Sequence, residues 1–202
     1  MSERLPTQSA FNIGFPQEIV SGRPRVVQTD RKDPVLGQTI LQEMREFLPD
    51  GRILEESYYR SDGTIAHRLM HEYSEAGEPT LIKRFEGAEV EKYTILAPEG
   101  LSNPLTARSP IEVQSGENGP VFTLFTPEQQ VIGRAEMRLG DTVRELSWFA
   151  DGETRPGMRR IERVDSRDNN GNWTQKTLFE QRGNGEPKPI AELYRRIAYY
   201  ET

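Results

Sequence analysis

Tyr59-Arg60-Ser61-Asp62-Gly63 joins an aromatic residue to a polar turn that ends in glycine. Glycine adopts positive φ without strain, and aspartate hydrogen-bonds to nearby backbone amides, so both residues favour turns. Variants of this order recur at Phe47-Leu48-Pro49-Asp50-Gly51, Tyr73-Ser74-Glu75-Ala76-Gly77, Phe149-Ala150-Asp151-Gly152 and Asp168-Asn169-Asn170-Gly171. We therefore expect each variant to form the corner of a β-hairpin, with the aromatic residue closing the strand before it.

Alternating runs of residues fill the spaces between these corners. From Ile65 to Tyr73 the odd positions form the more apolar face, and Arg68 and Glu72 lie at even positions, as in a half-buried strand. Further runs lie at 81–85, 90–96, 111–113, 121–125, 131–139, 143–149, 158–164, 172–179 and 190–200, and residues 115–119 are expected to form a hairpin loop. The pattern predicts an all-β, mainly antiparallel fold of about ten to twelve short strands. We expect a degenerate β-hairpin repeat meander that forms a long curved sheet or a half-open barrel.

Asn170-Gly171 is the strongest single turn signal. A type I′ turn needs positive φ at both central residues, and Asn followed by Gly tolerates this best. We therefore predict a type I′ hairpin here, leading into a strand that begins at Asn172-Trp173-Thr174.

Three segments depart from the strand pattern. Residues 1–32 are interrupted by prolines and glycines and are expected to form an extended N-terminal arm. In segment 36–48 the apolar residues recur every three or four positions, which fits one short helix, but a strand entering the corner at Gly51 fits equally. Residues 97–110 are rich in proline, glycine and serine. They subdivide an otherwise single β-repeat domain over 33–202.

Composition excludes several classes of function. The net charge is -6 with both signs interspersed, which disfavours nucleic acid as a partner. There is no cysteine, so disulfides and thiolate chemistry are excluded. No apolar run reaches the roughly 20 residues of a spanning helix, so we expect membrane association only through a partner. The first residues lack the apolar segment of a signal peptide, and an unprocessed chain is expected to be cytoplasmic.

The corners resemble those of bacterial proteins with YD/RHS-like repeats, whose units combine an aromatic residue, an acidic residue, a turn and a glycine. Tyr59-Arg60-Ser61-Asp62-Gly63-Thr64 is similar to such a unit. The segment from Asp168 to Thr174 and the closing strand Arg196-Ile197-Ala198-Tyr199-Tyr200 resemble uncharacterised envelope proteins with Gly-Asn-Trp-Thr repeats. The resemblance covers about half of the chain. It implies an array of β-hairpins and an extracytoplasmic location in the periplasm or cell envelope.

The sequence offers no catalytic or cofactor motif. His67 and His71 are the only histidines; on a strand they share a face but lie roughly 13 Å apart, so we expect no metal site. Asp165–Gly171 lacks the ligand alternation of a calcium loop. Paired carboxylates at a glycosidase spacing, a Gly-x-Ser-x-Gly elbow and a phosphate-binding glycine loop are also missing. We therefore expect neither enzymatic activity nor a cofactor.

Aromatic side chains are the most plausible contact residues. Those singled out as interaction residues are Tyr59, Tyr73, Trp148, Trp173 and Tyr199. Cross-strand packing within the sheet is the favoured explanation for all of them, because aromatic pairs are ordinary stabilisers of sheets.

Two hypotheses of function follow. The first is a non-enzymatic structural or accessory protein that acts through protein–protein interaction with other subunits of a larger assembly, associated with the cell envelope. Open sheet edges, aromatic faces and the N-terminal arm would supply the contacts. The alternative is a lipid- or glycan-binding module that resembles a β-barrel.

Overall fold

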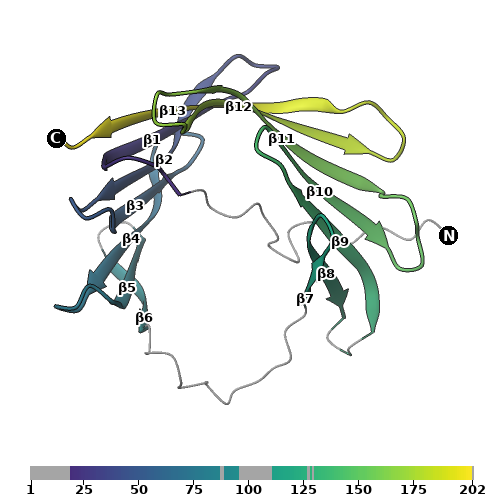
Figure 1. Cartoon of the computed structure of the whole chain (residues 1–202), viewed down its shortest axis with the longest axis horizontal. Coiled ribbons are helices and arrows are strands. Elements are labelled where there is room, and N and C mark those ends of the chain that lie inside the picture. Colours follow the sequence, from purple (N-terminus) through teal and green to yellow (C-terminus); the bar gives the residue numbers. More distant parts are fainter. Residues whose placement is uncertain (1–18, 87–88, 96–110, 127, 129, 202) are drawn as a thin grey trace. The chain divides into compact units, whose positions relative to one another are not determined.

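Thirteen β-strands in one hydrogen-bonded sheet make up the fold (Figure 1). The computed structural model describes residues 19–86, 89–95, 111–126, 128 and 130–201, and contains no helix among them. The strands are β1 (Pro24–Lys32), β2 (Thr39–Phe47), β3 (Ile53–Tyr59), β4 (Ile65–Tyr73), β5 (Pro79–Glu86), β6 (Glu89–Ile95), β7 (Ile111–Gly116), β8 (Gly119–Phe125), β9 (Val131–Leu139), β10 (Val143–Ala150), β11 (Met158–Arg167), β12 (Trp173–Arg182) and β13 (Lys188–Tyr199). The prediction of an all-β meander is confirmed.

The order of the strands is β6-β5-β4-β3-β2-β1-β13-β12-β11-β10-β9-β8-β7. Neighbouring strands in this order are consecutive in the sequence except at one place, where β1 pairs with β13 in an antiparallel ladder. The consecutive strands β6 and β7 stand at its two ends. The ladders from β1 to β6 and from β7 to β11 are antiparallel as well. Two meanders therefore start from a central pair of strands that comes from opposite ends of the described chain.

Two compact units divide the chain. Among the described residues, unit 1 comprises those within 111–165 and 176–191, and unit 2 comprises those within 19–95, 166–175 and 192–201. Strands β7 to β10 belong to unit 1 and β1 to β6 to unit 2, whereas β11, β12 and β13 contribute to both. The expected subdivision at 97–110 lies outside the described residues, as does the first part of the expected arm.

Four of the five predicted corners share one hydrogen-bond pattern. The corner at 149–152 differs: the amide of Glu153 donates to Ala150 O (3.1 Å), and β10 continues past Phe149 to Ala150. At the corner after β3, the amide of Arg60 donates to Thr64 O (2.8 Å) and that of Gly63 to Arg60 O (3.0 Å). Gly63 has φ of 82°, which glycine adopts without the steric cost that other residues bear. The same pair of bonds spans 48–52, 74–78 and 168–172. As predicted, β2, β3 and β4 end at the aromatic residue before each corner.

The type I′ turn predicted at Asn170-Gly171 is wrong. Asp168 donates its amide to Asn172 O (2.8 Å), and Gly171 donates to Asp168 O (3.0 Å), so the loop has three residues and ends in a bulge at glycine. The Asp168 side chain explains the difference. Its Oδ1 accepts hydrogen bonds from the amides of Asn170 and Asn172, both at 2.9 Å, which favours the longer loop.

Segment 36–48 forms a strand over Thr39–Phe47 and not the short helix. Its two sides pair with β1 and β3, so long-range ladders outweigh the helical spacing of its apolar residues. The last nine residues of the expected arm, Pro24–Lys32, likewise form β1. Their partner β13 lies at the other end of the sequence. Prolines and glycines mark only local interruptions of regular structure, so they could not indicate this pairing.

Both units bury apolar side chains together with charged ones. In unit 1, β8, β9 and β10 bury an apolar cluster of Leu124, Ala135, Met137, Leu146 and Trp148, and Lys176, which is 4% exposed, lies 3.3 Å from Glu162 Oε2. Unit 2 buries Val27 and Phe47, but also the charged residues Arg45 and Glu56, which are 3% and 6% exposed. Each unit therefore combines apolar packing with buried polar contacts.

Candidate functional site

The two tryptophans predicted as interaction residues are both buried. Trp148 is 4% exposed and belongs to the apolar cluster of unit 1. Trp173 starts β12 in unit 2, and its indole ring lies under the Arg195 guanidinium at 3.7 Å from Cζ to the ring centroid. Both rings are engaged inside the sheet, and they belong to different units.

The three predicted tyrosines are half-buried and lie in unit 2. Tyr59 closes β3 at the corner. The Tyr73 hydroxyl donates to Ile53 O (2.6 Å), and the Arg52 guanidinium lies 4.6 Å from its ring centroid. The Tyr199 hydroxyl donates to Asp168 Oδ2 (2.5 Å). The hydroxyl hydrogen bonds of Tyr73 and Tyr199 therefore connect neighbouring strands and corners.

A row of polar side chains crosses five adjacent strands of unit 2. The registers align Arg195, Thr29, Glu43, Tyr58 and His67 as successive Cα partners from β13 through β1, β2 and β3 to β4. Directly paired residues present their side chains on the same face of a sheet. At the usual strand spacing, four intervals make a polar row about 19 Å long.

Ion pairs and ring contacts tie this row to its neighbours. Arg45 Nε lies 2.8 Å from Glu43 Oε1, and His71 Nε2 lies 2.9 Å from Glu56 Oε1. Tyr58 donates its hydroxyl to Glu56 Oε2 (2.9 Å) and stacks on His67 with ring centroids 4.6 Å apart. His67 and His71 thus contact an aromatic ring and a carboxylate. No group of three or more His, Cys, Asp or Glu among the described residues is placed to hold a metal ion.

Burial shapes the electrostatics of the row. It is the largest influence on Glu43 and raises the pKa of that carboxyl; Arg45 and Arg195 oppose the shift, and Glu56 reinforces it. Burial also raises the pKa of Tyr58, with Glu56 and Glu43 adding to the effect. The geometry therefore gives a fixed network of mutually paired charges.

Sequence reasoning missed this polar row. Glu43 and Arg45 alternate with other residues as they would on a solvated face of a strand, and charged residues are rarely fully buried unless they are paired. One signal was present: Arg45 shares its parity with Phe47, a large apolar residue two positions on, so it lies on the buried face of β2.

Hydrogen bonds of the Asn172 side chain connect the chain before β1 to the corner before β12. Its side-chain amide donates to Ser21 O (3.0 Å) and Tyr199 Oη (2.7 Å), while its Oδ1 accepts the Ser21 amide at 2.7 Å. The residue is only 6% exposed. Asn172-Trp173-Thr174 matches a glycosylation acceptor, but this amide is engaged in the folded chain.

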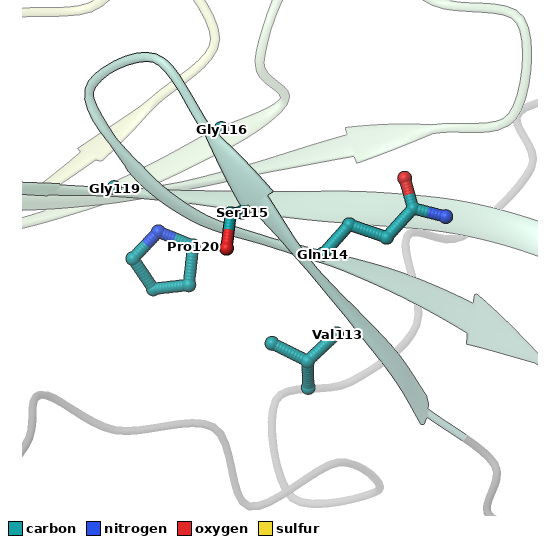
Figure 2. A pocket seen from close by; sticks show the side chains of 6 residues that line it. All are labelled: Val113, Gln114, Ser115, Gly116, Gly119 and Pro120. Atoms are coloured by element: carbon teal, nitrogen blue, oxygen red, sulfur yellow. The ribbon is translucent and has the colours of Figure 1, made fainter.

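The most exposed apolar edge of unit 1 is the β7–β8 hairpin. Five of the six β7 residues are exposed, and Val113 is 61% exposed. Within the described part of the chain, β7 ends the strand order and has β8 as its strand neighbour. A hollow of about 310 Å³ is lined by Val113, Gln114, Ser115, Gly116, Gly119 and Pro120 (Figure 2). An exposed strand edge beside a hollow has the geometry to which an extended chain can add.

Across the described ranges there is no helix long and apolar enough to cross a membrane. No family model matches the sequence, and no curated protein is significantly similar to it.

Proposed function

We propose that this protein is a non-enzymatic accessory subunit that binds another protein through the outer edge of β7. The observation that carries the proposal is the exposed strand itself, with five of its six residues open to solvent. Unpaired strand edges offer backbone donors and acceptors to an added chain, and proteins usually blunt them. β7 has neither a lysine nor a proline of its own.

The location of the assembly is proposed from the resemblance to envelope proteins with YD/RHS-like repeats. A hairpin array with one strongly exposed edge fits a subunit that docks on a larger partner. Membrane association would then pass through that partner.

A second function rests on the polar row of unit 2. Its half-buried members Glu43, Tyr58 and His67 offer a carboxylate, a hydroxyl and two rings, which suit a polyhydroxylated ligand such as a glycan better than a lipid, because a lipid needs an apolar wall. Loss of glycan binding on Tyr58→Phe, measured on a glycan array, would support this second function. If no glycan on the array binds, this second function is ruled out.

Site-specific photo-crosslinking in the host cells tests the leading proposal. A benzoylphenylalanine at Gln114 on β7 is expected to give a discrete adduct, identified by mass spectrometry. The control position is Ser61, an exposed residue in a corner of unit 2. Equal adducts at both positions, or no adduct at Gln114 together with a monomer in native mass spectrometry, would overturn the proposal.

A further inference from the structure

The hydrogen-bonding direction of β7 residues follows from the loop that joins β7 to β8. Gly116 and Gly119 are Cα partners on either side of the two-residue loop Glu117-Asn118. The pair next to such a loop is bonded, and bonded and non-bonded pairs alternate along an antiparallel ladder. Residues Gln114 and Glu112 therefore direct their backbone groups towards β8.

The intervening residues direct their backbone groups outward. Two of them are Ser115 and Val113, which alternate with the bonded positions. An independent feature agrees: Ser115 is the Cα partner of Pro120, and proline has no N–H with which to bond β7. The outer edge thus offers N–H and C=O groups at alternate residues to an added strand.

The hollow lies on one face of this edge. Figure 2 shows the side chains of Val113, Ser115 and Pro120 on one side of the hairpin and that of Gln114 directed away from them. Gly116 and Gly119, which have no side chain, complete the lining. A strand added along β7 would place every second side chain over this face, where Val113 and Pro120 favour an apolar group.

Glu112 places a negative charge on the opposite face of β7. It is exposed, and β7 itself contains no basic residue. A strand paired to β7 therefore places every second side chain over the apolar face at Val113. Its other side chains lie near the negative charge of Glu112. Opposite charges on paired strands favour a basic side chain there.

On this basis we infer that the occupant of the β7 edge is an extended segment of another protein in which apolar and basic residues alternate, added antiparallel to β7. The inference rests on the proposed function and names the partner's chemistry. The apolar residues cover Val113 and the hollow, and a lysine or arginine faces Glu112. Main-chain hydrogen bonds to Val113 and Ser115 hold the segment in register.

Peptide binding to the full chain tests the inference. The probe is a fluorescent peptide with the sequence Lys-Val-Lys-Val-Lys-Val, and the matched probe is Glu-Val-Glu-Val-Glu-Val; anisotropy gives both affinities. Val113→Pro is expected to weaken binding of the lysine peptide about tenfold, because it removes an outward N–H. Glu112→Lys is expected to shift the preference about threefold or more towards the glutamate peptide.

Two results would overturn the inference: unchanged binding to Val113→Pro, or an unchanged peptide preference in Glu112→Lys. Sedimentation velocity and amide exchange of the free protein distinguish other occupants. A dimer that Val113→Pro abolishes would identify a second copy, and slow exchange at Val113 in a monomer would identify a segment of the same chain; either outcome overturns the inference. A persistent crosslink at Gln114 would still leave the proposed function standing.

Discussion

At the scale of single residues, the corner before β12 is stabilised by a polar network that replaces packing. Partial burial acts to raise the pKa of Asp168, but hydrogen bonds from Tyr199, Asn172 and Asn170 outweigh it and lower that pKa overall. The same carboxylate, together with burial, raises the pKa of the Tyr199 hydroxyl. Asn172 then joins this pair to Ser21. One amide side chain therefore holds three segments that are distant in sequence.

Asn172→Ala is expected to lower the free energy of unfolding by about 1–3 kcal/mol, because buried partners lose their hydrogen bonds. Urea denaturation followed by tryptophan fluorescence measures the change. Asn169→Ala in the same loop serves as the control, since that residue is exposed. An equal loss in both variants would mean that the network contributes nothing particular.

The corner aspartates predict a loss of stability in acid. Hydrogen bonds from Arg52 lower the pKa of Asp50, and those from Thr64 lower the pKa of Asp62, both below the ordinary 3.8. A carboxylate with a lowered pKa stabilises the fold above its unfolded pKa, and this contribution is lost as the pH falls through the folded value.

Asp62→Asn keeps an acceptor but cannot titrate, so the variant is expected to be less stable than the parent above about pH 5 and to converge with it below about pH 3. Thermal midpoints measured from pH 2 to pH 7 provide the comparison. A difference that stays constant over this range would show that ionisation of Asp62 has no role.

At the scale of elements, the corners were predictable and the details of pairing were not. The order from Tyr59 to Gly63 contains its own turn chemistry, so sequence alone placed the hairpin. The type I′ prediction at Asn170-Gly171 failed because it considered two residues, whereas Asp168 bonds across the whole loop. The polar row was not predictable, because its members come from five strands and become neighbours only through register.

The start of β8 shows how closely neighbouring strands approach. A Cβ atom on Gly119 would lie 2.3 Å from Met137 O on β9. Gly119→Ala is therefore expected to destabilise unit 1 by about 2 kcal/mol or more, since backbone must move. Gly152→Ala is the control: it has φ of 74° but no atom within 4 Å, so it bears only the conformational cost of about 1 kcal/mol. Equal costs by urea denaturation would contradict the close approach.

At the scale of the whole molecule, the pairing of β1 with β13 organises the strand order. The local hairpins could be inferred from sequence because each joins neighbouring runs. The β1–β13 ladder could not, because Val27 and Ile197 are Cα partners across most of the chain and no local pattern encodes that contact. Such nonlocal pairing also predicts slow folding relative to a chain of hairpins alone.

The same substitution in a central and an edge strand tests this order. Arg196→Pro in β13, which has neighbours on both sides, is expected to cost about 3 kcal/mol or more. Arg196→Ala corrects for loss of the side chain and its ion pair with Asp30. Val113→Pro on β7 is expected to cost less than about 1 kcal/mol. Similar unfolding free energies for the two proline variants would contradict the strand order.

Amide hydrogen exchange across β7 tests the central claim that this edge receives a partner. The account predicts fast exchange at Val113 and Ser115 in the isolated chain and strong slowing of these two amides when the crosslinked partner is added. Gln114, already bonded to β8, is predicted to exchange slowly in both states. Slow exchange at Val113 in the isolated chain, or protection by the partner that leaves β7 unchanged, would contradict the account.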